Sequence, residues 1–342
     1  MKTHLNTLFV TTQGAYLAKD GETVAVRIER SVKLRIPIHT LDGIVTFGNV
    51  GCSPFLMGFC AERNVSVSFL TEHGRFLARV TGPVSGNVLL RREQYRKADD
   101  PEFSTAVARA CITAKIANCR HVLKRALRDH PDKVDINDLH STVRRLTASI
   151  DRLGHVGCLD EIRGIEGDAA HNYFSVLGHL VTKNRKAFEF SHRNRRPPLD
   201  RMNCLLSFLY TILMHDIRSA LESAGLDPAV GFLHRDRPGR FGLALDIMEE
   251  FRPLVDRVAL SLVNLEQLKE RDFRISENGA VRLKDDAKKI LLQVYQKRKQ
   301  DIMQHPFLAR KMSIGMFFYM QALLLARFLR GDLDGYPPVI WR

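Results

Sequence analysis

The sequence predicts an α+β protein, in which a small N-terminal β domain precedes a larger, mostly α-helical domain. From Leu5 to about Val80, apolar and polar residues alternate with a period of two, as they do in strands that bury one face. Beyond Asn87, apolar residues recur with a period of about 3.6, as they do in amphipathic helices. This change of period predicts that the two parts of the chain have different structures.

Between the two parts lies the segment TGPVSGN, from Thr81 to Asn87, which is rich in Gly, Pro and Ser. This composition is typical of a connection between domains. We therefore expect a β domain over residues 1–80, a linker over 81–90 and a helical domain over 91–342. A chain of 342 residues is also long enough for about two domains.

Helices are expected in both parts. In the β domain, Ser53 is a suitable N-cap and Pro54 suits the first helical position, so a helix is expected up to Arg63. Alternation on both sides of an Asn-Gly pair predicts a hairpin over 273–283. In the second domain the period predicts helices over 104–127, 136–153, 159–181, 203–224, 241–251, 255–269, 286–299 and 312–329.

The chain is strongly basic. Lys and Arg number 52 against 38 Asp and Glu, which gives a formal net charge of +14 and favours polyanionic partners such as nucleic acid. The longest apolar run, from Cys204 to Met214, is shorter than the roughly 18 residues of a membrane-spanning helix, so we expect a buried helix and no membrane association. Six scattered cysteines and an N-terminus unlike a signal peptide indicate a cytoplasmic protein.

The segment GFLHRDRPGRFGLALDIMEEFRP, residues 231–253, combines one histidine with three acids. If 241–251 is a helix, Asp246, Glu249 and Glu250 share one face, because they are spaced i, i+3, i+4. Together with His234, they would suit a divalent metal ion. A solvated helix face beside an ordinary loop histidine explains this segment equally well.

A second segment, IRGIEGDAAHNYF, places Glu166 among Ala169, Ala170, Tyr173 and a phenylalanine. A carboxylate on an apolar face must be neutralised, paired or bound to a cation when it is buried. The alternative is an exposed glutamate in the first turn of a helix, stabilised by the helix dipole.

A third segment, SHRNRRPPLDRMNCLLSFLY, places Arg193, Arg195 and Arg196 directly before two prolines and a buried helix. The rigid prolines fix where the guanidinium groups point, and clustered arginines bind phosphates bidentately. A solvated run of charges is the alternative.

The segments IEGDAAHNYF, RRPPLDRMNCLLSFLY and GFLHRDRPGRFGLALDIMEEFRPLVDR, in this order, resemble the CRISPR-associated protein one family, the integrase of spacer acquisition. The resemblance implies a metal site, Mn²⁺ or Mg²⁺, formed by Glu166, His234 and Glu249, with Asp246 as a possible further ligand. Its expected DNA-binding residues are Arg193, Arg195, Arg196, Arg237, Arg240 and Arg252, and its expected supporting residues are Tyr173 and Asn203.

The resemblance also implies a function. Family members join the 3′-hydroxyl ends of short foreign double-stranded DNA to a repeat array by transesterification. They act as homodimers with CRISPR-associated protein two as a bridging partner, and the β domain is expected to serve dimerisation and docking. Two alternatives are a metal-dependent nuclease for branched or single-stranded DNA and a non-catalytic, architectural DNA-binding protein.

Overall fold

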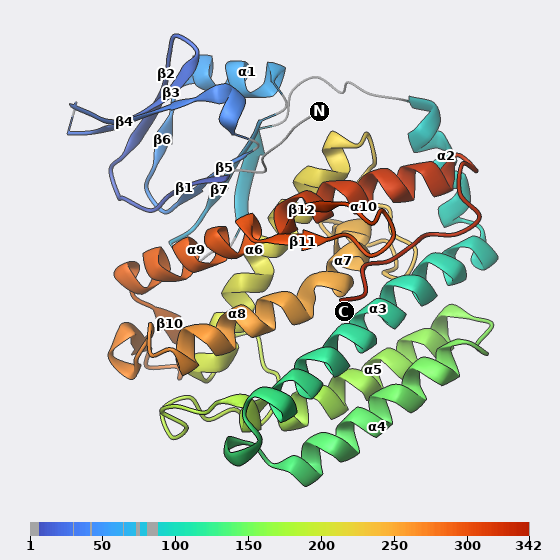
Figure 1. Ribbon diagram of the computed structural model, residues 1–342. Helices are drawn as coiled ribbons and strands as arrows, with labels where there is room; N and C mark the ends of the chain where they lie inside the picture. The colour runs from blue at the N-terminus through green and yellow to red at the C-terminus, as the bar shows by residue number, and fades with distance from the viewer. Residues whose placement is uncertain are drawn as a thin grey trace.

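The computed structural model describes residues 7–29, 31–41, 43–63, 65–72, 76–80 and 88–341. Most of its strands lie in the N-terminal part and most of its helices form the rest, as Figure 1 shows. The predicted α+β class is therefore confirmed. The expected linker residues 81–87 lie outside the described residues, whereas residues 88–90 already belong to a helix that the sequence pattern did not predict.

Two four-stranded sheets form the N-terminal part. The first has the order β1-β5-β7-β8, in which β1, β5 and β7 run parallel, and the second has the order β4-β3-β2-β6. These strands are β1 Thr7–Val10, β2 Tyr16–Asp20, β3 Thr23–Ile28, β4 Ser31–Pro37, β5 Gly43–Phe47, β6 Gly51–Cys52, β7 Ser66–Leu70 and β8 Phe76–Val80.

Helix α1, Pro54–Glu62, packs beside these sheets as predicted. Ser53 caps it, because its hydroxyl accepts a hydrogen bond from the backbone N–H of Leu56 at 3.2 Å. The apolar residues of α1 and of both sheets form a separate small core, which includes Leu17, Ile44 and Phe59. Strand β5 of the first sheet is buried on both faces, because Ile44 belongs to this small core and Val45 and Phe47 belong to the core of the helical part.

The remaining chain is mostly helical, and except for α2 its helices fall on the predicted ranges, with ends that differ by up to five residues. The helices are α2 Val88–Ala98, α3 Pro101–Asp129, α4 Ile136–Leu153, α5 Leu159–Leu177, α6 Arg201–Ser223, α7 Gly242–Met248, α8 Arg252–Asn264, α9 Asp285–Gln300 and α10 Ile314–Leu329. The predicted hairpin is present as β9 Phe273–Ile275 and β10 Val281–Leu283. A second hairpin, β11 Ile302–Gln304 with β12 Lys311–Ser313, was not predicted.

Helix α6 is the central helix of the fold. It is long and apolar enough to cross a membrane, but 67% of its most apolar window is buried inside the protein. Phe208 of α6 stacks on Phe47 of β5 with ring centroids 5.7 Å apart, and Ser219 shares a hydrogen bond with Ser66 of β7 at 3.0 Å. The predicted buried helix therefore also joins the first sheet to the helices.

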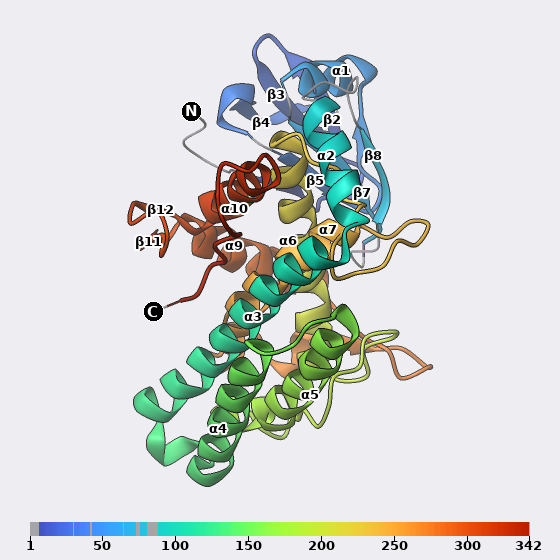
Figure 2. The same ribbon diagram turned by 90° about the vertical axis from the view of Figure 1, so that its right-hand side faces the viewer.

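Helices α3, α4 and α5 form an elongated three-helix arm that extends from α6, as Figure 2 shows. In α4 the apolar side facing α3 and α5 includes Leu139, Leu146 and Leu153, which are fully buried. Helix α3 runs from this arm into the centre of the molecule, so its side chains reach both α5 and α8. It therefore brings charged residues to the middle of the fold.

The C-terminal segment packs back against the helices. The buried Glu250 carboxylate accepts hydrogen bonds from the Tyr336 hydroxyl at 2.6 Å and from the Val339 backbone N–H at 2.7 Å. The ring of Trp341 lies 6.1 Å from those of Phe251 and Phe317. Trp341 thus packs against the protein's own aromatic side chains.

Replacing Tyr336 with Phe tests this attachment. We expect Tyr336→Phe to lower the free energy of unfolding by about 1–3 kcal/mol, because the buried Glu250 loses its hydroxyl donor. Denaturant unfolding measures the change. Tyr16→Phe is the matched control, since Tyr16 is 44% exposed and its change should lie within about 0.5 kcal/mol. Equal stability of both variants would show that the hydroxyl of Tyr336 does not contribute to holding the segment.

Candidate active site

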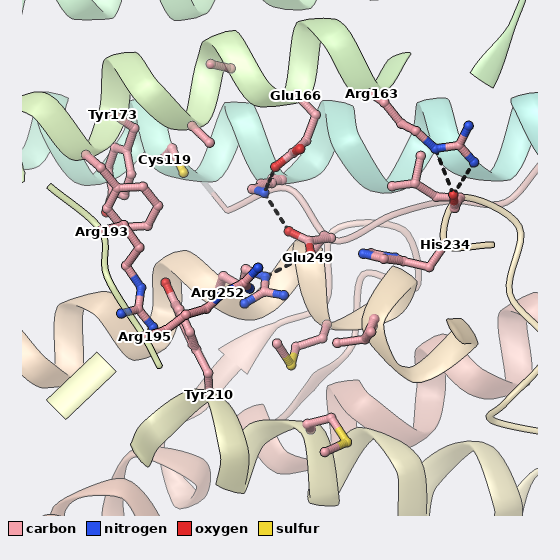
Figure 3. Close-up of a pocket in the computed structure, with 18 of the residues that line it drawn as sticks. Cys119, Arg163, Glu166, Tyr173, Arg193, Arg195, Tyr210, His234, Glu249 and Arg252 are labelled. Atoms are coloured by element: carbon pink, nitrogen blue, oxygen red, sulfur yellow. Dashed lines mark hydrogen bonds and ion pairs between the residues drawn. The ribbon is translucent and has the colours of Figure 1, made fainter. Parts of the chain in front are cut away.

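A cavity of about 860 Å³ lies between α3, α5, α6 and the loop that precedes α7. It contains most of the residues that the sequence singled out, as Figure 3 shows for its central part. The predicted residues that line it are Glu166, Tyr173, Arg193, Arg195, Arg196, His234, Arg237, Arg240, Glu249 and Arg252. Asp246 and Asn203 do not line it but support residues that do.

The centre of the cavity is a lysine between two carboxylates. The Lys115 ammonium of α3 forms ion pairs with Glu166 of α5 and, at 2.7 Å, with Oε2 of Glu249. Although burial alone would lower the pKa of Lys115, Glu249 and Glu166 keep it above its ordinary value, so the ammonium is charged at neutral pH. Glu166 is thus a paired acid beside an apolar stripe, as the sequence hypothesis requires.

Glu249 is the more deeply buried of the two acids, with 5% of its side chain exposed. Burial would raise its pKa, but Arg252 and Lys115 lower it to about 2, so Glu249 is ionised throughout the physiological range. Arg252 Nε lies 2.9 Å from Glu249 Oε1, and the Arg252 guanidinium stacks 4.8 Å from the centre of the Tyr210 ring. Arg252 was expected to contact DNA; in this structure it pairs with Glu249, and a contact with DNA stays a prediction.

His234 is oriented by a fully buried aspartate. Its Nδ1 donates a hydrogen bond to Asp246 Oδ1 at 2.6 Å, and Asp246 also accepts from the backbone N–H groups of Phe232, Leu233 and His234 at 2.6 to 3.1 Å. The ring of His234 therefore points its other nitrogen toward Glu249 in Figure 3. Asp246 acts as an orienting residue in this arrangement, and both of its oxygens are occupied.

The predicted shared face of Asp246, Glu249 and Glu250 is wrong. Helix α7 ends at Met248 and the chain continues as a 3-10 turn, so the three carboxylates diverge. Asp246 turns to the loop before α7, Glu249 to the cavity and Glu250 to the C-terminal segment, where burial raises the pKa of Glu250 to about 7. Gly231 makes this loop possible, because a Cβ at Gly231 would lie 2.9 Å from Asp246 Oδ2.

The arginines divide into anchored and exposed groups. Arg193 donates hydrogen bonds to Asn203 Oδ1 at 2.6 Å and to Ser207 Oγ at 3.0 Å, which explains the supporting role expected of Asn203. Arg195, Arg196 and Arg237 are exposed on the rim of the cavity. These rim guanidinium groups are available to phosphates.

One further buried acid was missed by the sequence analysis. Asp256 of α8 accepts hydrogen bonds from the hydroxyls of Tyr210 at 2.6 Å and Tyr173 at 3.2 Å. Burial raises the pKa of Asp256 to about 6. Lys115 was missed as well, although both residues share the signal that identified Glu166, a charge within an apolar helical stripe.

The residues at the centre of the cavity fit a divalent cation. A cationic group already occupies the space between Glu166 and Glu249, and Oε2 of Glu249 is buried without a well-directed hydrogen bond despite the nearby ammonium. Two carboxylates and an imidazole are ligands for Mn²⁺ or Mg²⁺. Among the described residues, a tighter group of donor atoms, within 4.8 Å of one another, is formed by Asp135, Asp138 and His179, which lie near the surface.

The fold is shared with solved structures of one class of protein. A casposase bound to integration product has a TM-score of 0.85 at 24% identity, covering 99% of this chain and 95% of that one. A Cas1 protein from Thermotoga maritima has a TM-score of 0.80 at 26% identity, covering 95% and 97%. A chain of a Cas6-RT-Cas1–Cas2 complex has a TM-score of 0.81 at 24% identity, covering all of this chain and 36% of that one. The fold is therefore that of Cas1 proteins and of a casposase.

Sequence comparison identifies the family within this class. The description "CRISPR associated protein Cas1" matches residues 8–297. The chain is 58% identical over 343 residues to CRISPR-associated endonuclease Cas1 1 of Chlorobaculum tepidum and 50% identical over 351 residues to CRISPR-associated endonuclease Cas1 2 of Rhodospirillum rubrum, with each pair covered in full. The chain belongs to the Cas1 family, which confirms the resemblance found in the sequence. It is thus a nuclease or integrase of CRISPR adaptation.

The pKa of Asp256 predicts a pH dependence of stability. The folded protein keeps a proton that the unfolded chain releases near its ordinary pKa of 3.8, so stability falls as pH rises from about 4 to about 6. We expect Asp256 to contribute about 2–3 kcal/mol to this fall. Asp256→Asn should lack that contribution and keep only the fall that comes from the raised pKa of Glu250. Denaturant unfolding across this pH range measures it. The control Asp286→Asn, at a side chain that is 92% exposed, should keep the wild-type slope.

Proposed function

We propose that this protein is a metal-dependent DNA integrase of spacer acquisition, which joins the 3′-hydroxyl ends of short double-stranded DNA to a repeat array. The observation that carries this proposal is the pair of carboxylates, Glu166 and Glu249, that already holds a cationic group beside an oriented His234. Such a pair lies at the centre of a cavity rimmed by arginines, where a phosphodiester can enter.

In this proposal Glu166, Glu249 and His234 hold Mn²⁺ or Mg²⁺ in place of the Lys115 ammonium. A divalent ion at this position supplies Lewis-acid stabilisation of charge at phosphorus and at the leaving oxygen. Asp246 keeps the proton of His234 on Nδ1, which leaves Nε2 as the coordinating atom. Arg252 and the anion of Glu249 remain paired, so the ligand stays ionised.

The surrounding residues position the DNA. Arg195, Arg196, Arg237 and Arg240 line the rim, where guanidinium groups bind backbone phosphates. Arg193 is fixed by Asn203 and Ser207 at the wall, which restricts where a bound phosphate can sit. Transesterification then requires the 3′-hydroxyl and the attacked phosphodiester to meet in the same cavity.

The partners proposed from the relatives are double-stranded DNA, a second copy of this chain and the Cas2 protein. Among the solved neighbours, one is a casposase bound to integration product and another is a chain of a Cas6-RT-Cas1–Cas2 complex, which supports DNA and Cas2 as partners. We assign dimerisation and docking to the N-terminal β part, residues 1–80, joined by residues 81–90 to a catalytic helical part. We also propose that the protein acts in the cytoplasm.

A plasmid-joining assay tests the proposal. A labelled 3′-hydroxyl duplex is incubated with supercoiled plasmid, the Cas2 partner and Mn²⁺ or Mg²⁺. We expect covalent joining that chelator abolishes and that Glu166→Gln lowers by at least a hundredfold, since the cation loses one anionic ligand.

Two other results would change the assignment. Relatives of this chain bear the name endonuclease, and cleavage without any joining would identify a nuclease that uses water as the nucleophile. DNA binding with neither reaction, and no difference between Glu166→Gln and wild type, would identify an architectural protein.

Replacing Lys115 with Met tests the exchange of ammonium for metal. We expect Lys115→Met to lower the stability of the metal-free protein by about 3 kcal/mol, because Glu249 is left as a buried, less compensated charge. Mn²⁺ should raise the melting temperature of Lys115→Met by more than that of wild type, since no ammonium has to be displaced. Thermal unfolding with Mn²⁺ or chelator measures both effects. Lys289→Met, at an exposed ion pair, is the control, and an equal Mn²⁺ effect in Lys115→Met and wild type would contradict the exchange.

A further inference from the structure

A second group of basic side chains lies where α3, α8 and α9 meet, outside the candidate active site. Burial and the positive charges of Arg125 on α3 and Arg298 on α9 lower the pKa of Arg257 on α8. Burial and the positive charges of Arg257, Arg125, Arg128 and Lys124 likewise lower the pKa of His121. We call this group the distal basic cluster; it consists of His121, Lys124, Arg125, Arg128, Arg257 and Arg298. These residues do not line the cavity of the active site.

Arg257 is the centre of the cluster and has an unusual environment. Its side chain is partly buried, yet no residue in the described part of the chain forms a hydrogen bond or an ion pair with it. Burial together with Arg125 and Arg298 lowers the pKa of Arg257 to about 10. A guanidinium normally loses its hydration only in exchange for an anionic or polar partner.

The charges of the cluster are not balanced by its acids. Arg125 and Arg128 share the single carboxylate of Asp129, at 3.0 and 2.9 Å, and Arg298 pairs with Asp301 at 2.7 Å. With Lys124 and Arg257, five permanent cations thus face two carboxylates, which leaves three positive charges uncompensated. Such mutual repulsion destabilises the free protein unless an anion binds.

The cluster faces a different side of α3 from the active site. At about 100° per residue, Arg125 and Arg128 point roughly 80° and 140° away from Lys115 around the helix axis. Figures 1 and 2 agree that α9 lies to one side of α3 and α5 to the other. A phosphate bound at the cluster therefore belongs to a DNA segment other than the one inside the active-site cavity.

We propose that the distal basic cluster is a second DNA-binding site, which takes the backbone phosphates of a duplex segment separate from the one in the active site. This inference rests on the proposed function, because it assumes that the protein handles DNA. Three uncompensated charges match two or three successive phosphates, since a duplex carries one charge per about 1.7 Å of its axis. An unpaired, pre-positioned Arg257 suits bidentate contact with a phosphate.

The test measures the affinity for a labelled duplex as a function of salt, using the full chain without metal. We expect Arg257→Gln and Arg298→Gln each to weaken binding roughly tenfold and to lower the slope of log affinity against log salt by about one. Arg330→Gln is the matched control; Arg330 is exposed and pairs with Asp332 away from the cluster. It should keep the wild-type affinity and slope.

A second measurement separates this role from a structural one. Because Arg257→Gln relieves repulsion, we expect the variant to melt at a higher temperature than the wild type when DNA is absent. Lower stability together with unchanged DNA affinity would assign Arg257 to packing and overturn the proposal. The proposal is also overturned if inorganic phosphate stabilises wild type more than Arg257→Gln while both bind duplex equally, because the cluster would then bind a small anion.

Failure of this inference can be told from failure of the proposed function. Glu166→Gln should lose joining, whereas Arg257→Gln and Arg298→Gln should lose duplex affinity, and the two properties are measured separately. If Glu166→Gln loses joining while Arg257→Gln and Arg298→Gln bind DNA as wild type does, only the second site is refuted. If Glu166→Gln still joins DNA, the assignment of the active site fails, and the affinity measurements on the cluster stand by themselves.

Discussion

The contact on which the rest of the structure depends is the Lys115 ammonium between Glu166 and Glu249. It ties three helical segments, α3, α5 and the turn after α7, at the centre of the protein. Two acids so close together repel each other, and in a buried place their charges are tolerated only when a cation lies between them. The two acids therefore require a positive charge between them. The Lys115 ammonium supplies this charge here, and in the proposed function a metal ion supplies it.

The 3-10 turn after α7 directs the side chains of Glu249 and Glu250 to different parts of the molecule. Glu249 faces the cavity, whereas Glu250 faces away and receives donors from Tyr336 and Val339 of the C-terminal segment. Asn118 of α3 donates to the backbone carbonyls of both Glu250 and Val339. The position of Glu249 consequently depends on the C-terminal segment, because that segment binds the neighbouring Glu250 from almost ninety residues later in the chain.

Much of this arrangement follows from the sequence, but not all of it. Periodicity predicted the sheets and most helices because each buries one face, and the motif resemblance brought Glu166, His234 and Glu249 together. Helix spacing alone misplaced Asp246 beside Glu249, because it assumes a regular helix where a 3-10 turn occurs. Lys115 and Asp256 each lie as a charge within an apolar helical stripe, but their partners come from distant segments, and the sequence pattern does not show which residues pair across the fold.

The length of helix α6 fixes the distance between two groups of contacts in the molecule. Ser219 contacts the first sheet, and Tyr210, nine positions earlier, contacts Arg252 and Asp256 at the cavity. At a rise of 1.5 Å per residue, the two contacts are held about 13 Å apart along a rigid rod. One inserted residue would rotate them by about 100° relative to each other, so this helix tolerates changes of side chain but not of length. Because Phe208 stacks on the first sheet as well, one residue inserted between Phe208 and Ser219 would also break one of the two contacts that α6 makes with this sheet.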